Sequence, residues 1–156
     1  MQSFPPTIIL RHRRENIKKC SLRGLENRAD LCFFSYPNNT LPSLDQYLLL
    51  AIDAPYLSIE DAHWGVLLLD GTWRYAGKME KNALAHFTGP KRSIPPFFQT
   101  AYPRRQTDCQ DPTRGLASVE ALYLSYRLLG RSTHGLLDAY HWKEEFYRLN
   151  QLTENT

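Results

Sequence analysis

The chain has 156 residues, of which 42% are hydrophobic and 22% charged, a composition typical of one globular domain or of two small, closely packed ones. No apolar run approaches the ~20 residues that a membrane-spanning helix needs, and residues 1–14 lack the apolar centre of a signal peptide. Both absences predict a cytoplasmic protein. The three cysteines include no CxxC pair, which argues against a disulfide framework and a structural zinc site.

The net charge of +3 is modest, but the basic residues gather in two parts of the chain. Clustered cations suit a phosphate backbone, so RNA contact is one interpretation and an ordinary solvated surface is the other. The two clusters are Arg11, Arg13, Arg14, Lys18, Lys19 and Arg23, followed by Lys91, Arg92, Arg104 and Arg105.

The N-terminal half predicts a first α/β unit. Residues 7–10 and 31–36 are typical of short strands, and a basic helical segment is expected over about 20–26 between them. A turn follows at 37–40. Residues 44–52 are apolar and fit either a helix or a strand, and 59–63 predict a short helix.

The run at 65–69 is apolar without alternation, as in a strand covered on both faces of a parallel sheet. It ends at Asp70, followed by a glycine, a threonine and Trp73. Ligands of open α/β sheets bind beyond the carboxyl ends of the strands, so Asp70 and Trp73 are expected at the rim of a crevice. A capping aspartate followed by a core tryptophan is the alternative.

A polar helix is expected downstream of Trp73, ending near Gly89-Pro90, and this break is taken as a boundary between residues 1–90 and 91–156. A polar loop follows at 106–115. An amphipathic helix over 116–129 ends at Gly130, with Ser118 as its cap and its first amides as an anion site. A last helix is expected over 136–152.

The sequence lacks the residue patterns that several common kinds of functional site require. There is no GxxxxGK[ST] loop and no GxGxxG, so nucleotide-binding folds of those kinds have no support. His63 has no nucleophile signature beside it, which favours a structural histidine. His134 and His141 are seven residues apart without a third ligand, so no metal is expected.

Two segments together resemble a known family. Residues 69–79, LDGTWRYAGKM, resemble the signature of DTW-domain proteins, which are tRNA-uridine aminocarboxypropyltransferases. Residues 115–122, GLASVEAL, are similar to the element that follows this signature in the same superfamily.

The chain also resembles the neighbouring branch, the ribosomal-RNA aminocarboxypropyltransferases, in three segments. These are Lys18-Lys19-Cys20-Ser21, residues 92–95 and residues 142–150. Residues 101–105, AYPRR, are nearer to the DTW branch, but the N-terminal cysteine cluster of many DTW proteins is missing. The chain therefore lies between the branches, and rRNA and tRNA are both open as acceptors.

The resemblance implies an α/β, SPOUT-like fold with a mostly parallel central sheet, a small N-terminal α/β part and a deep trefoil knot in the C-terminal part. It implies an enzyme that uses S-adenosylmethionine and transfers the 3-amino-3-carboxypropyl group to N3 of a uridine or pseudouridine in RNA, releasing methylthioadenosine. A monomer without metal or membrane partners is expected. The rivals are a SPOUT-type RNA methyltransferase and a non-catalytic RNA-binding module of ribosome assembly.

The resemblance also assigns site residues. Asp70 is the catalytic candidate, either holding the amino group of the cofactor or helping to remove the N3 proton, and Trp73 packs on the cofactor. Ser21 lies near the cofactor carboxylate or is an ordinary helix cap, and Tyr102 covers the cofactor, stacks on a splayed base or belongs to the core. The remaining cofactor candidates are Leu69, Ile94, Pro95, Leu116, Ala117 and Ser118. The candidates for RNA phosphate contact are Arg11, Arg13, Arg14, Lys18, Lys19, Arg104 and Arg105.

Overall fold

The computed structural model describes residues 4–12, 21–37, 40–70, 73–103 and 115–153, with backbone only for 73–76. Five strands and three α-helices are described within these ranges, together with a short 3-10 helix, η2, at Ile59–Asp61. The strands are β1 Thr7–His12, β2 Leu31–Tyr36, β3 Tyr47–Leu50, β4 Gly65–Asp70 and β5 Lys91–Arg92. The α-helices are α1 Trp73–Ala83, α2 Ser118–Leu128 and α3 Lys143–Asn150.

The strands form one parallel sheet in the order β2-β1-β4-β3-β5. β1 and β4 are neighbours near its centre, and Arg11 stands opposite Asp70 in their register. All residues of β4 are buried except the partly exposed Leu69, which explains the absence of alternation in its sequence. The predicted α/β fold with a mostly parallel sheet is confirmed.

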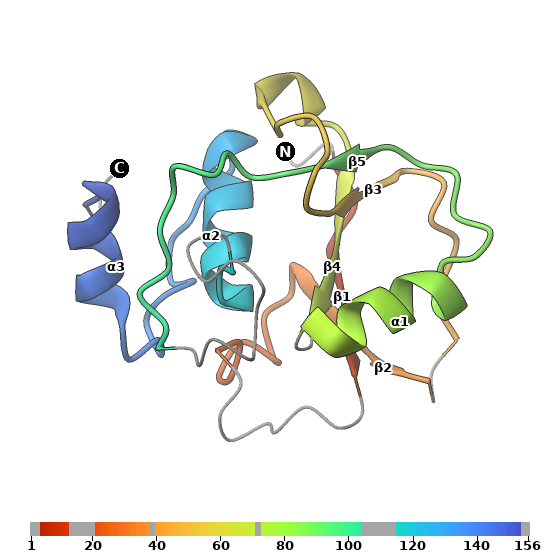
Figure 1. Cartoon of the computed structure of the whole chain (residues 1–156), viewed down its shortest axis with the longest axis horizontal. Helices are drawn as coiled ribbons and strands as arrows, with labels where there is room; N and C mark the ends of the chain where they lie inside the picture. Colours follow the sequence, from red (N-terminus) through yellow and green to blue (C-terminus); the bar gives the residue numbers. More distant parts are fainter. Residues whose placement is uncertain (1–3, 13–20, 38–39, 71–72, 104–114, 154–156) are drawn as a thin grey trace.

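Helices cover both faces of the sheet, with α1 on one side and α2 and α3 on the other (Figure 1). Successive residues of a strand point to opposite faces. Leu67 accordingly joins the core cluster on the α1 face with Ile8, and Leu68 joins the larger cluster on the α2 face with Ile9. Asp70 is two residues after Leu68, so its carboxylate points toward α2.

The N-terminal half follows most of the predictions. β1, β2 and β4 lie where strands were expected, residues 44–52 resolve into strand β3, and the helix expected at 59–63 is the shorter η2. The helix expected over 20–26 is wrong for the described residues, because 21–24 form a turn. Gly24 has a φ of +96°, a conformation that interrupts a right-handed helix, and a Cβ at this position would come within 3.1 Å of the Ala139 Cβ.

The C-terminal half differs from the predictions at helix ends. α1 ends at Ala83, earlier than expected, and α2 ends as expected before Gly130, whose φ is +77°. α3 begins only at Lys143, because the preceding segment forms turns around Gly135, with a φ of +78°, that still bury Leu136 and Leu137. The boundary at residue 90 falls just before β5, which pairs with β3, and the division into two parts stays a prediction, as does the knot. No described helix has the length and apolar character needed to cross a membrane.

Candidate functional site

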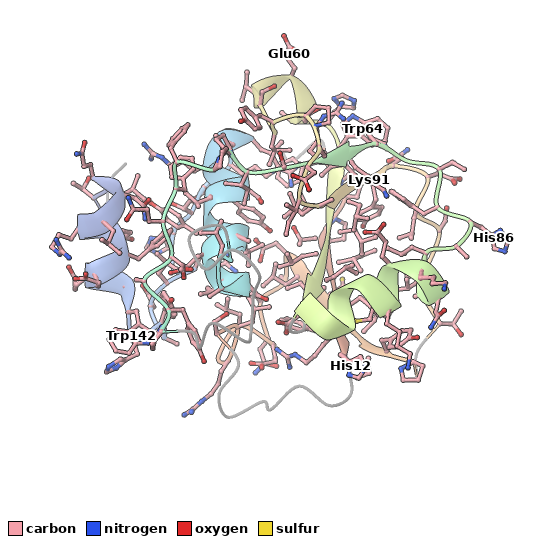
Figure 2. All side chains as sticks on the ribbon, in the orientation of Figure 1. His12, Glu60, Trp64, His86, Lys91 and Trp142 are labelled. Atoms are coloured by element: carbon pink, nitrogen blue, oxygen red, sulfur yellow. The ribbon has the colours of Figure 1, made fainter. Side chains whose placement is uncertain are left out.

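The carboxyl ends of β1 and β4 meet the N-terminus of α2 at one edge of the sheet (Figure 1). Figure 2 labels His12, the last residue of β1, at this end, and Glu60 of η2 at the opposite end of the molecule. The chain leaves β1 toward β2 on one side and leaves β4 toward β5 on the other. Such a change of direction between neighbouring parallel strands is where open α/β sheets bind ligands.

Asp70 is a buried carboxylate with a donor on each oxygen. Only 2% of the residue is exposed. Arg11 Nε donates to its Oδ2 at 3.0 Å, and Ser118 Oγ donates to its Oδ1 at 2.7 Å. Asp70 thus joins β1, β4 and α2 at one point. The two donors offset the cost of burying its carboxylate, which would be high without partners.

Arg11 carries the positive charge of the site. Its side chain is 11% exposed, its Nη1 lies 3.5 Å from Glu26 Oε2, and its guanidinium lies over the Phe33 ring at 4.8 Å from the centroid. Arg11 was expected to contact RNA phosphate. Its two described carboxylate partners place it inside the site, and phosphate contact stays a prediction.

Ser21 reaches the N-terminus of α2 from a distant part of the chain. Its Oγ accepts a hydrogen bond from the Val119 amide at 3.0 Å, across 98 residues of sequence. Ala117 occupies the N-cap position and supplies no side-chain bond. The expectation that Ser118 caps this helix is therefore wrong: Ser118 donates to Asp70, and Ser21 takes the capping role.

Glu120 is a fully buried carboxylate that ties two loops and a turn together. Its Oε1 accepts from Thr100 Oγ1 at 2.6 Å and from the Ala117 amide at 2.8 Å. Its Oε2 accepts from the Ala101 amide at 2.8 Å and from the Tyr140 hydroxyl at 2.9 Å. With 0% exposure and four donors, this side chain fixes the segment before Tyr102 against the start of α2.

Apolar residues complete the walls on the α2 side. Ile94, Tyr102 and Leu116 are partly buried and pack against the core of that face, and Ala117 is 2% exposed. Pro95 is also buried. Leu69 points to the other face, where it packs with the α1 cluster, so its side chain does not join these walls.

Glu26 is the exposed member of the charge cluster. Burial acts to raise the pKa of its carboxyl, but hydrogen bonds from the Glu26 and Gly24 backbone, together with the charge of Arg11, lower it below the ordinary value. The Gly24 amide donates to Glu26 Oε1 at 2.8 Å. Glu26 is thus held as a carboxylate next to Arg11.

The structure brings Asp70, Ser21 and Ser118 together at the start of α2, whereas the Leu69 side chain lies on the other face of the sheet. The sequence analysis did not single out two further carboxylates, Glu120 and Glu26. Glu120 stands inside the GLASVEAL segment, and its position three residues after Ala117 is the capping-box spacing that signals a structural glutamate. Glu26 carries no such signal, because its turn brings it to Arg11 only in three dimensions. The Trp73 side chain and Arg13, Arg14, Lys18, Lys19, Arg104 and Arg105 lie outside the described residues.

Two described histidines lie beside tryptophans that follow them in the sequence. The His63 and Trp64 rings are tilted relative to each other, with centroids 5.3 Å apart. The His141 and Trp142 rings meet edge to face, with centroids 4.7 Å apart. Within the described ranges, no three histidine, cysteine, aspartate or glutamate side chains come together as metal ligands. Cys32 is a half-buried free thiol, and Cys20 and Cys109 lie outside the described residues.

A cavity of about 880 Å³ opens elsewhere, on the α1 face of the sheet. Its lining includes Tyr36, Asn82 and Leu84, and Asn82 Nδ2 donates to the Tyr36 hydroxyl at 3.0 Å. Asp70, Ser21 and Ser118 do not line it. The predicted site residues that the structure brings together at the α2 N-terminus are therefore separate from this cavity, whose lining includes Asp45 and His86.

Comparison with known proteins gives one informative likeness. No family model matches the sequence, and a search of curated proteins also finds no match. Among solved structures, the chain is similar to the SAM-dependent rRNA:acp-transferase Tsr3 from Vulcanisaeta distributa, with a TM-score of 0.68 and 19% sequence identity. The match covers 95% of this chain and 79% of that one, so the two share a fold over nearly the whole length of this chain.

Proposed function

We propose that this chain is an S-adenosylmethionine-dependent RNA 3-amino-3-carboxypropyltransferase. The observation that carries the proposal is the fold shared with an rRNA:acp-transferase over 95% of the chain, with Asp70, Ser21 and Ser118 gathered at its ligand-binding edge. The acceptor is N3 of a uridine or pseudouridine in rRNA or tRNA, and the by-product is methylthioadenosine. We propose a cytoplasmic monomer with a DTW-type, SPOUT-like fold and a C-terminal trefoil knot.

The residues present fit this cofactor chemically. An amino acid zwitterion needs an anion receptor beside a cation receptor, and Arg11 and Asp70 supply both within one ion pair of 3.0 Å. The Val119 and Ala117 amides at the start of α2 already donate to Ser21 and Glu120, so the carboxylate has to find its donors elsewhere. Ile94, Pro95 and Leu116 offer apolar surface for an adenosine, and Trp73 and Tyr102 are the aromatic candidates to cover it.

S-adenosylmethionine, when bound, supplies electrophilic carbons next to a sulfonium, and orientation decides which one is transferred. Asp70 would hold the amino end of the aminocarboxypropyl arm and fix Arg11 and Ser118. Both Asp70 oxygens already accept hydrogen bonds from Arg11 and Ser118, which supports the role of Asp70 in fixing these two residues and counts against removal of the N3 proton. Glu120 would keep the loop that ends at Tyr102 in place against α2.

The test uses S-adenosylmethionine labelled separately on its methyl group and its carboxyl carbon, incubated with the purified protein and with RNA from cells that lack this modification. Carboxyl label in RNA is the expected result, and the size of the labelled RNA identifies rRNA or tRNA. Methyl label alone would instead establish the methyltransferase. Absence of both labels would contradict the transferase and favour a non-catalytic RNA-binding module.

RNA binding is tested by neutralising two basic residues of the second cluster, with Arg104 and Arg105 both changed to Gln. Each neutralised RNA phosphate contributes to the salt dependence of binding, so we expect weaker RNA binding and a salt slope that is smaller by about one for each arginine that pairs with a phosphate. Cofactor affinity should not change. Equal RNA affinity at matched ionic strength would rule out this assignment.

A further inference from the structure

Arg11 is a largely buried cation whose two carboxylate partners differ sharply in exposure. Asp70 lies 3.0 Å away with a side chain 3% exposed, whereas Glu26 lies 3.5 Å away with a side chain 36% exposed. The Nε atom of Arg11 pairs with Asp70, and its Nη1 atom pairs with Glu26. One pair is therefore part of the core, and the other lies at the solvent-facing edge of the same guanidinium.

The Glu26 pair has the features of an exchangeable contact. Glu26 belongs to the turn at 21–27 and is held locally by the Gly24 amide at 2.8 Å. Exposed ion pairs contribute little to stability, because water solvates both partners well. Arg11 itself stays in place without Glu26, because Asp70 binds its Nε and the Phe33 ring lies against its guanidinium.

We propose that Arg11 is the receptor for the α-carboxylate of the aminocarboxypropyl arm, and that Glu26 is a placeholder anion which this carboxylate displaces. The inference rests on the proposed function and names the residue that selects its donor. A guanidinium presents a planar fork of donors that matches a carboxylate, and Ser21 in the same turn lies at the adjacent end of α2. Glu26 is the second anion beside Arg11, in addition to Asp70, when no ligand is bound.

This arrangement makes the carboxylate the feature of the donor that the protein recognises. A ligand with the carboxylate binds Arg11 and must displace Glu26. A ligand without it gains nothing from Arg11 and leaves the Arg11–Glu26 pair in place. Decarboxylated S-adenosylmethionine keeps the sulfonium and the amine, whereas S-adenosylhomocysteine keeps the carboxylate and the amine without the sulfonium charge. The two compounds therefore separate the carboxylate from every other charge of the donor.

The experiment is calorimetric titration of the full chain and of Glu26→Gln with S-adenosylmethionine, S-adenosylhomocysteine and decarboxylated S-adenosylmethionine. Removing the placeholder charge should tighten binding of the two carboxylate ligands by up to about five-fold, the range of an exposed ion pair, and more at low salt. Binding of the decarboxylated compound should not change. Glu60→Gln is the matched control, because Glu60 is exposed at the opposite end of the molecule (Figure 2).

A second variant tests the receptor itself. Arg11→Lys keeps a cation beside Asp70 but loses the fork, so it should weaken binding of both carboxylate ligands about ten-fold and weaken binding of the decarboxylated compound much less. An equal effect of Glu26→Gln on all three ligands, or weaker binding of the carboxylate ligands, would overturn the inference while leaving the proposed function standing. If no adenosyl compound binds the unmodified protein, the proposed function fails and the inference fails with it.

Discussion

At the scale of single residues, two buried carboxylates organise the site, and they do so in different ways. Asp70 joins β1, β4 and α2 through one cation and one hydroxyl. Glu120 binds four donors, of which two are backbone amides. A buried carboxylate with this many donors is costly to alter, because each donor left without an acceptor loses its hydration and gains nothing in return.

We expect Glu120→Gln to destabilise the protein by about 2–3 kcal/mol. Each Glu120 oxygen accepts one backbone amide, so the NH2 group of glutamine must face either Ala101 or Ala117, and an amide cannot become an acceptor. Urea denaturation followed by circular dichroism measures the loss. Glu144→Gln on the exposed side of α3 is the control, and equal stability of the two variants would contradict this account.

At the scale of elements, α2 depends on a residue that is far from it in sequence. Its N-cap position is an alanine, and the hydrogen bond that a cap normally supplies comes from Ser21. The helix therefore begins where the turn at 21–24 meets it, and the Ser118 side chain in its first turn reaches Asp70 at the end of β4.

Ser21→Ala should cost about 1 kcal/mol of stability, the usual value for a lost N-cap, and should weaken cofactor binding. Ser21→Thr keeps the hydroxyl and should retain most of both. Thermal unfolding and titration with S-adenosylmethionine measure the two effects. An alanine variant as stable as the threonine variant would show that this hydrogen bond does not support the helix.

The sequence predicted best those elements whose secondary structure is determined by residues close together in the chain. The apolar run of β4 and the stripe of α2 before Gly130 depend only on neighbouring residues, and both were located within one or two residues. The helix expected at 20–26 failed because Gly24 and its packing against Ala139 decide that segment. Ser21 as the cap of α2, and Glu26 as a partner of Arg11, could not be predicted, because both arise from contacts across the fold.

At the scale of the whole molecule, the strands of the N-terminal half are joined to the helical C-terminal part by hydrogen bonds. Tyr126 of α2 hydrogen-bonds Thr7 at the start of β1 at 2.8 Å, across 119 residues, and lies 3.2 Å from Asp30 Oδ2. Arg28 binds both oxygens of Asp30, at 2.9 and 3.0 Å, and donates to the His134 carbonyl at 2.9 Å. These contacts make the N-terminal strands and the C-terminal helices one unit.

The buried hydroxyl of Tyr126 makes the stability of the folded protein depend on pH in the alkaline range. Burial raises the pKa of Tyr126 from 10.0 to about 12. Between these values the folded protein keeps a proton that the unfolded chain releases, so stability should fall as pH rises from about 10 to about 12, by on the order of 2–3 kcal/mol, and should then level off. Tyr126→Phe removes this contribution. Urea unfolding from pH 8 to 12 compares the two proteins, and a constant difference between them across this range would contradict the assignment.

The bond between Ser21 and the Val119 amide also bears on synthesis of the protein. Ser21, Arg11 and Asp70 are synthesised before the segment that carries Ser118, Val119 and Glu120. The contacts between β1, β4 and α2 therefore cannot form until that later segment has been made, and until then the charged side chains of Arg11 and Asp70 stay in water. Ligands that bind only the folded state can then protect the completed protein but cannot guide its nascent form.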